Sequence, residues 1–356
     1  PRHLSASAIG IHQLLDLIRR PSLLLSHAAI SAAFVSSINR VCSYAYGLLQ
    51  NGTFLFATYS ATTTDTYVVD FNAATGKVTS QPSRINSSNA GKSMYPLWFD
   101  GGRMISYYAV PPTKVVTKRF PDGPERSFPI GLQAAGGNTW MSDGTAVFPG
   151  FRAGVGEGLF RVNLQTSKIE PILLRTAGAG GFGGFRGGFP TISADGNIVF
   201  YRDDRRHAIT ARNLKESTER VVYEEKGPPY GNIRSVHRSP DEKWIAFIVN
   251  HLRSNTLMIV PASGGSAREL CTARWPDEIH AAQSFSWMPD SKRILFVRRN
   301  GERSELWNVS IDKPRPQRTG FAHAGMRHLA VHPDGGSLAY AAGEQGQMSI
   351  QSVELK

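Results

Sequence analysis

The sequence is poor in cysteine and shows no sustained helical pattern. Its 356 residues include two cysteines, Cys42 and Cys271, and no cysteine–histidine spacing typical of a metal site. This count excludes a disulfide framework, and Cys271, which lies in an apolar segment, is expected to be a small core residue. No helical period of 3.6 residues is found between residues 40 and 356. The chain is therefore neither a disulfide-rich nor a helical protein.

Signatures of several functional classes are also missing. No Gly-x-Ser-x-Gly elbow supports a serine nucleophile. The glycine-rich stretch 177–188 lacks the Gly-Lys-Ser/Thr ending of a phosphate-binding loop, and is expected to be either a lid over a binding site or an insertion without a role. The net charge is +12, but the basic residues are scattered, which argues against specific nucleic-acid binding. The excess charge should still attract acidic ligands weakly, in a salt-dependent way.

The first forty residues differ from the rest. Arg19-Arg20 precedes a mildly apolar stretch at 22–37, which is the order of a signal sequence, but serine, histidine and alanine dilute it. The stretch is too polar for a transmembrane helix. We expect residues 1–40 to form an N-terminal arm packed on the domain that follows.

What the sequence does contain is a repeat. Ser-Pro-Asp-Glu-Lys-Trp-Ile-Ala-Phe at 239–247 recurs as Met-Pro-Asp-Ser-Lys-Arg-Ile-Leu-Phe at 288–296 and His-Pro-Asp-Gly-Gly-Ser-Leu-Ala-Tyr at 332–340. Weaker copies lie at 50–56, 99–107, 141–148 and 193–200. We call the residue just before each turn its anchor. The anchors are about 42 to 52 residues apart and are Leu48, Trp98, Trp140, Ile192, Arg238, Trp287 and Val331.

The repeat predicts the fold class. Each copy combines a tight Asp- and Gly-containing turn with short apolar runs, and its length suits one four-stranded blade of a propeller. Seven copies predict an all-β, seven-bladed β-propeller of antiparallel blades over residues 41–356. The last blade lacks an outer strand, which we expect the N-terminal segment near 29–37 to supply, because open sheet edges invite mispairing. A chain truncated at its C-terminus is the alternative.

The repeat resembles that of the TolB family of propellers, which carry Trp-Ser-Pro-Asp-Gly-Lys-x-Ile-Ala-Phe. The likeness covers residues 41–356 and is most specific at 229–340. Such repeats occur in periplasmic binding proteins, peptidase accessory domains, sensor proteins and some polysaccharide lyases. The resemblance implies a bacterial, monomeric, periplasmic or secreted protein that binds a peptide, a protein partner or a small anionic ligand, with no membrane span.

A binding site is expected where the loops between blades converge on the central channel. Strand alternation predicts that residues one and three positions before each anchor face the channel, and these include His237 and His328. The expected ligand contacts are Tyr95, Phe189, Arg234, Gln283, Arg327 and His328.

The alternative is an enzyme at the same channel mouth. His280, His323 and His328 with Glu278 would bind a divalent metal such as zinc, manganese or calcium, unless each histidine is an ordinary surface or capping residue. A metal-assisted hydrolase or polysaccharide lyase would then use Arg234 and Arg327 as cationic groups and His237 or His328 as the base.

Overall fold

The structure, a computed structural model, divides into two compact units. It describes residues 63–87, 92–110, 114–132, 137–174, 190–227, 229–280, 283–301 and 303–343, together with the backbone of three further strands. These are β1 (Ser43–Leu48), β2 (Thr53–Tyr59) and β29 (Met348–Glu354), which form an antiparallel sheet in the order β1-β2-β29 within the unit made of Pro1–Thr63 and Glu344–Lys356. The second unit is Thr64–Gly343.

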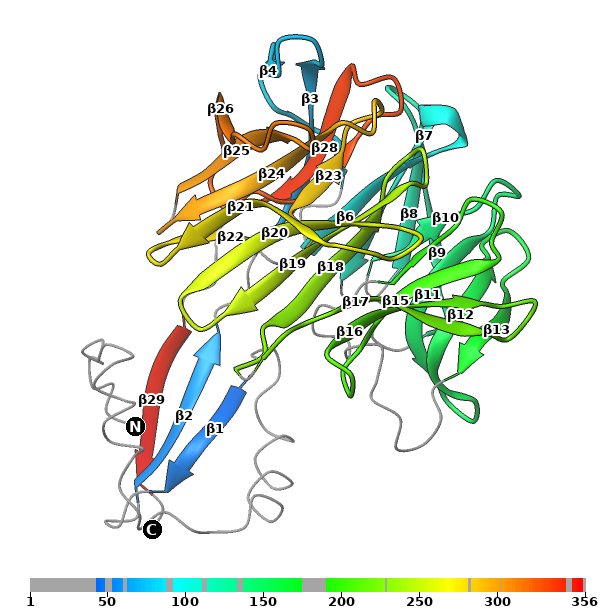
Figure 1. Ribbon diagram of the computed structural model, residues 1–356. Coiled ribbons are helices and arrows are strands. Elements are labelled where there is room, and N and C mark those ends of the chain that lie inside the picture. The colour runs from blue at the N-terminus through cyan, green and yellow to red at the C-terminus, as the bar shows by residue number, and fades with distance from the viewer. Residues whose placement is uncertain are drawn as a thin grey trace. The chain divides into compact units, whose positions relative to one another are not determined.

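The second unit consists of six antiparallel sheets, which we name blades A to F (Figure 1). Blade A contains β6 (Lys92–Phe99), β7 (Met104–Val110), β8 (Lys114–Arg119) and β9 (Glu125–Pro129). Blade B contains β10 (Thr139–Trp140), β11 (Ala146–Arg152), β12 (Gly156–Asn163) and β13 (Lys168–Leu174). Blade C contains β14 (Thr191–Ile192), β15 (Ile198–Asp203), β16 (Ala208–Asn213) and β17 (Glu219–Glu224). Blade D contains β18 (Asn232–Arg238), β19 (Trp244–His251), β20 (Ser254–Pro261) and β21 (Arg268–Arg274).

The last two blades are less regular. In blade E, β22 (Asp277–Ile279) and β23 (Phe285–Trp287) both pair with β24 (Arg293–Asn300), followed by β25 (Arg303–Ser310) and β26 (Gln317–Ala322). Blade F joins β27 (Arg327–Val331) and β28 (Ser337–Ala342) to β3 (Asp65–Asn72), which also pairs with β4 (Lys77–Val78) and β5 (Ser83–Arg84). Within the described residues the one helical element is the 3-10 turn η1 (Asp100–Gly102). No helix there is long and apolar enough to cross a membrane.

The prediction of seven blades is wrong, and the number is six. β28 pairs with β3 from Ser337 opposite Asp70 to Ala342 opposite Asp65, so a strand from the N-terminal part of the unit closes the ring. The copy that follows anchor Leu48 builds no blade: β1 pairs with β2, and β2 pairs with β29, which the seven-blade prediction assigns to the last blade. A hairpin repeat specifies its own turn but not which third strand pairs with its free edge. The expected closing segment, residues 29–37, lies outside the described residues.

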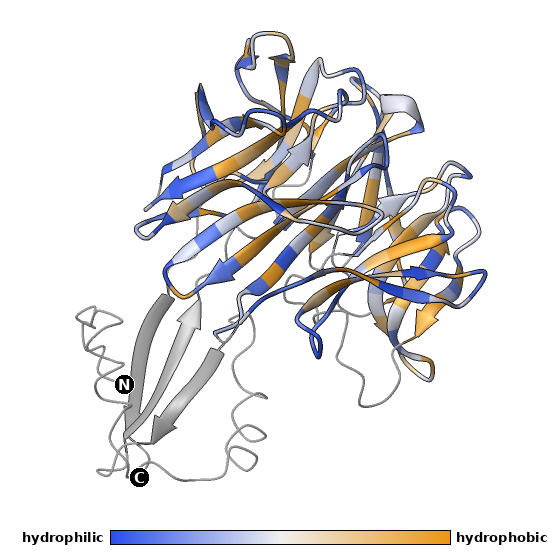
Figure 2. Cartoon of the chain, in the orientation of Figure 1, coloured by the Kyte–Doolittle hydropathy of each residue, from blue (hydrophilic) through white to orange (hydrophobic). Residues whose placement is uncertain are grey.

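Hydrophobic side chains hold the ring together. Six buried clusters each fill one junction between neighbouring blades, including the junction between blade F and blade A. Figure 2 shows the pattern on β24, where the hydrophobic run Ile294–Val297 is followed by hydrophilic residues at the strand end. Because the blades follow one another in chain order and close F onto A, blade B lies opposite blade E.

Three anchors tie their blade to the one before it through a side-chain N–H. Trp98 Nε1 of blade A donates a hydrogen bond to Ala330 O of blade F at 3.0 Å, and Trp287 Nε1 of blade E donates to the His237 carbonyl of blade D at 3.2 Å. Arg238, the polar anchor of blade D, bonds a carbonyl of blade C through its Nε in the same way, at 3.1 Å. A side chain with an N–H donor is therefore useful at this position, because it satisfies a backbone carbonyl between blades.

The aspartate of the repeat shapes the turn itself. Asp195, Asp241 and Asp290 each accept a hydrogen bond from the backbone N–H two residues later, at 2.9 to 3.2 Å. In two of these turns a preceding serine, Ser193 or Ser239, also donates to the aspartate and accepts a backbone N–H from the next strand. These local bonds explain why the turn recurs in sequence.

Three inner strands contain a β-bulge at the same place. The pairing register shifts at Met94/Leu97 in β6, Arg234/His237 in β18 and Arg327/Ala330 in β27. Inside these shifts lie Tyr95, Ser235 and His328, with φ of 56°, 52° and 53°, a left-handed conformation that non-glycine residues seldom adopt. A bulge adds one residue to a strand and changes which face the following side chains point to. Simple alternation, on which we based the channel-facing positions, therefore does not run through these strands.

Candidate functional site

Three consecutive blades carry long polar side chains in or just before their inner strands. Arg234 in blade D, Gln283 in blade E and Arg327 in blade F each lie four residues before the anchor of their blade. Hydrogen bonds join the backbone here: Gln283 N donates to Ser235 Oγ at 3.0 Å, and Leu329 N donates to Gln283 O at 3.1 Å. We call Arg234, Gln283 and Arg327 the D–F rim. All three were among the expected ligand contacts, and the structure places them on adjacent blades.

The side chain of Gln283 extends across the channel. A methyl group added to Gly137 would collide with the Gln283 amide, so this amide lies directly against Gly137. Gly137 precedes β10 of blade B, which is opposite blade E in the ring. The channel is therefore crossed at this level by one side chain. A ligand that enters from the D–F rim would meet the Gln283 amide.

Both arginines of the rim have buried nitrogen atoms without a partner among the described residues. Arg327 Nε and Nη2 and Arg234 Nε make no hydrogen bond to any described residue and are shielded from solvent. Burial lowers the pKa of Arg327, and the nearby Arg299 lowers it further, while Tyr95 opposes this. Burial and the neighbouring Arg202 likewise lower the pKa of Arg234, opposed by Asp204. Arginine remains charged at neutral pH, so the rim holds positive charge, and three of its N–H donors are satisfied by no described residue.

An aromatic pair flanks Arg327. The rings of Tyr95 and His328 lie 4.0 Å apart, and His328 is 4% exposed with no partner for its Nδ1 among the described residues. Burial holds the pKa of His328 well below its ordinary value, with Arg327 and then His280 adding to the effect. Burial and the charges of Arg327 and Arg299 lower the pKa of His280 to about 4. Both imidazoles are therefore neutral at pH 7.

The remaining predicted site residues contact other protein side chains or lie outside the described residues. His237 packs its ring against Phe285 at 4.6 Å, and burial lowers its pKa to about 4. His323 bonds Tyr340 Oη through its Nδ1 at 2.8 Å. Glu278 lies 3.5 Å from Arg299 Nε. Phe189 lies outside the described residues.

The structure brings His280 and His328 near each other but does not assemble the predicted metal site. Among the described residues, no three His, Cys, Asp or Glu side chains are arranged to hold a metal ion. His323 has its ring 4.8 Å from that of Tyr67, edge to face, in addition to its bond to Tyr340. The metal-binding group of His280, His323, His328 and Glu278 therefore stays a prediction without structural support.

Sequence reasoning missed Arg299 and Gly137. Arg299 is at the end of β24, the second strand of blade E, where its charge acts on Arg327 and His280. Gly137 makes room for the Gln283 amide from the opposite blade. The available signals were the Arg298-Arg299 pair and a glycine three residues before an anchor, and neither indicates a partner in another blade.

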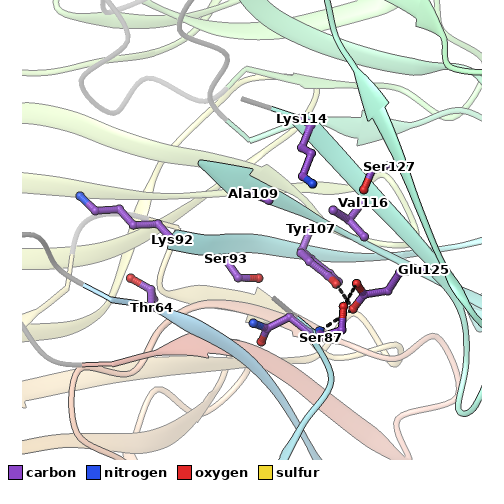
Figure 3. Close-up of a pocket in the computed structure, with 11 residues that line it drawn as sticks. Thr64, Ser87, Lys92, Ser93, Tyr107, Ala109, Lys114, Val116, Glu125 and Ser127 are labelled. Carbon is purple, nitrogen blue, oxygen red and sulfur yellow. Dashed lines mark hydrogen bonds between the residues drawn. The ribbon is translucent and has the colours of Figure 1, made fainter. Parts of the chain in front are cut away.

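A cavity of about 310 Å³, separate from the D–F rim, lies between blades F and A (Figure 3). Its carboxylate, Glu125 on β9, accepts hydrogen bonds from Tyr107 Oη and Ser87 Oγ, and from Ser87 N at 2.7 Å. Figure 3 shows both partners converging on this carboxylate, while Lys92 and Lys114 lie farther along the cavity. Burial alone would raise the pKa of Glu125, but the bonds from Ser87 and Tyr107 bring it below its ordinary value. Glu125 therefore joins blade A to the segment after β5 and is not left free for a ligand.

Comparisons with known proteins bear on the fold. No protein-family model and no curated protein matches the chain. A protein of Agrobacterium tumefaciens assigned as TolB matches with a TM-score of 0.61 and 11% identity over 80% of this chain and 99% of that chain. TolB from Acinetobacter baumannii matches with a TM-score of 0.53 and 17% identity over 81% and 66%. A chain of a nidogen/laminin complex matches with a TM-score of 0.52 and 7% identity over 78% and 98%. The expected resemblance is confirmed at the level of fold: the chain has a TolB-like β-propeller.

Proposed function

We propose that this propeller binds a carboxylate-bearing ligand at the D–F rim. The ligand is an acidic peptide segment of a partner protein or a small molecule with the same group. The observation that carries the proposal is the set of unsatisfied donors on Arg234 and Arg327. A buried charged donor without a partner is costly, and a carboxylate can accept two parallel N–H bonds from one guanidinium.

The surroundings suit such a ligand. Tyr95 and His328 form an aromatic wall next to Arg327, and Gln283 presents an amide that can donate to a carboxylate or accept from a peptide N–H. Because the Gln283 side chain crosses the channel to Gly137, we expect the end of a ligand to insert from the rim without threading the ring. The net charge of +12 would speed the approach of an acidic partner at low salt.

The test is a binding titration with a fluorescein-labelled hexaglutamate peptide, followed by fluorescence anisotropy. Arg327→Gln and Arg234→Gln should each weaken binding by about ten-fold to a hundred-fold, since a hydrogen bond to a charged group contributes about 1.5–3 kcal/mol. Arg103→Gln is the matched control, because this exposed arginine pairs with Asp100 near η1. Equal affinity of all four proteins for the peptide would refute the proposal.

A competition experiment separates the two sources of the carboxylate. Free glutarate that displaces the peptide at millimolar concentration would show that the carboxylate alone is recognised. Displacement only by unlabelled hexaglutamate would show that the peptide backbone or several carboxylates are needed.

The metal-assisted hydrolase or lyase has no specific observation in its favour. Its proposed ligands do not form a group of three among the described residues. Metal analysis of the purified protein tests it directly: a stoichiometric divalent metal that is lost in His328→Ala would revive the enzyme hypothesis.

A further inference from the structure

The junction between blades A and B contains a large groove on the side of the repeat turns. The groove has a volume of about 1110 Å³, above the usual range of roughly 300–1,000 Å³ for small-molecule pockets. It is formed by η1 and strands β7 to β9 of blade A, and by β10, the turn after it and the β12–β13 turn of blade B. We call it the A–B groove. Its apolar lining consists of Phe99, Met104, Phe128, Trp140, Met141 and Leu164.

Three other junctions are closed on this side by hydrogen bonds between neighbouring turns. Ala194 N of blade C donates to Glu242 of blade D at 2.7 Å, and Asp241 N of blade D donates to Ser291 Oγ of blade E at 3.0 Å. Blade F reaches blade A through His332 Nε2, which lies 3.2 Å from Gly102 O. The turns of blades A and B, all of whose residues the structure describes, make no hydrogen bond of this kind with each other. The A–B groove occupies the space that turn contacts fill at those three junctions.

Two of the aromatic rings that line the groove stack on each other. Phe99 and Trp140 stack with their ring centroids 3.9 Å apart and their planes 8° from parallel. Trp140 is held in place by a 2.7 Å hydrogen bond from its Nε1 to Ser106 Oγ. Both rings are only partly buried, so they present a fixed apolar surface that a large side chain could cover.

The charges around the groove are one-sided. Its lining includes Arg119 and Arg126, both exposed, and neither forms an ion pair with any described residue. The one acidic residue of the lining, Asp100, is already paired with Arg103 at 2.5 Å. A partner that places carboxylates beside the two arginines would therefore meet no competing internal acid.

We propose that the A–B groove docks an extended acidic peptide segment of a partner protein. One large apolar side chain of the segment covers the stacked rings of Phe99 and Trp140, and flanking carboxylates pair with Arg119 and Arg126. Methionines suit such a surface because their side chains adapt to different partners. This site is separate from the D–F rim, and the inference does not depend on the proposed function there.

The test begins with a phage-displayed library of random dodecamer peptides. The library is panned in parallel on the wild-type protein, on Arg119→Glu/Arg126→Glu and on the control Arg205→Glu/Arg315→Glu, which reverses two exposed arginines on other blades. Wild type and control should enrich one class of sequence, with acidic residues on both sides of an aromatic or leucine residue. Recovery of that class should fall at least ten-fold on Arg119→Glu/Arg126→Glu.

The best peptide is then synthesised, and its dissociation constant is measured by fluorescence anisotropy. Ser142→Trp, which fills the groove from an exposed lining position, should weaken binding at least ten-fold, while Arg327→Gln should leave it unchanged. Circular dichroism confirms that each variant is folded. The inference is overturned if no sequence is enriched on the wild type, if the peptide binds Arg119→Glu/Arg126→Glu equally well, or if Arg327→Gln and not Ser142→Trp abolishes binding.

Discussion

Replacing Trp98 with phenylalanine tests the junction at which the ring closes. Trp98 of blade A donates from Nε1 to Ala330 O of blade F, and its ring lies edge-on to Phe120 at 4.9 Å and to His332 at 4.7 Å. Trp98→Phe keeps an aromatic ring but removes the N–H donor and part of the packed surface. Because the same junction is where β3 completes blade F, the loss should weaken ring closure.

The magnitude follows from these contacts. Loss of one intramolecular hydrogen bond costs about 1 kcal/mol. Loss of roughly 40 Å² of packed apolar surface costs about 1 kcal/mol more at ~25 cal/mol per Å². The free energy of unfolding should therefore fall by about 2 kcal/mol, which for a unit of this size lowers Tm by about 3–4 °C.

The assay is urea unfolding followed by far-UV circular dichroism, since the substitution alters tryptophan fluorescence. Trp275→Phe, at a side chain that is 74% exposed, is the matched control and should change stability by less than about 0.5 kcal/mol. Amide hydrogen exchange should also become faster in the β28–β3 ladder of the Trp98 variant. The reasoning is refuted if the two variants are equally stable, or if the exchange rates of that ladder do not change.

Three further predictions concern the channel and the cavity of Figure 3. Gly137→Ala should displace the Gln283 amide and change hexaglutamate affinity at least three-fold in the anisotropy titration, yet leave Tm nearly unchanged, because the end of a flexible side chain moves at little cost. Binding of hexaglutamate should strengthen as pH falls from 7 toward 5. The pKa values of His280 and His328 lie low in the free protein, and a bound anion beside them should raise these values, so that binding takes up protons. A pH-independent affinity in titrations from pH 5 to 8 would contradict this. Glu125→Gln should destabilise the protein by about 1 kcal/mol at pH 7 in urea unfolding. The difference between the two proteins should vanish in acid. The pKa of Glu125 is lower in the folded than in the unfolded protein, so its carboxylate stabilises the fold at neutral pH and loses that contribution as pH falls through the folded-state pKa.

Part of the candidate site could be predicted from the sequence because it depends on the repeat. Once the anchors are aligned, Arg234, Gln283 and Arg327 fall at one position in three consecutive blades, and adjacent blades bring equivalent positions together. The contacts across the ring could not be predicted in this way. The fit of the Gln283 amide against Gly137 requires knowing which blade lies opposite, and that depends on the number of blades.

The bulges show a second limit of the sequence pattern. Tyr95, Ser235 and His328 adopt positive φ although none is glycine, and nothing in their side-chain type indicates it. The one-residue shift buries Ser235 completely and leaves His328 only 4% exposed, where alternation placed them in the channel. The conformation goes with the register shift of each inner strand, which the sequence pattern does not show.

The sequence by itself determined the blade: its turn, its alternating strands and the polar rim residues all rest on interactions within about fifty residues. Aspartates bond backbone groups two residues away, and apolar side chains recur at every second position, so local chemistry is sufficient. Only the tertiary structure decided that there are six blades, that β3 closes the ring on β28, and that the copy beginning at Leu48 pairs with β29 instead. Pairing at a strand edge uses backbone groups that every sequence carries, so the choice of partner depends on how many blades pack into a closed ring.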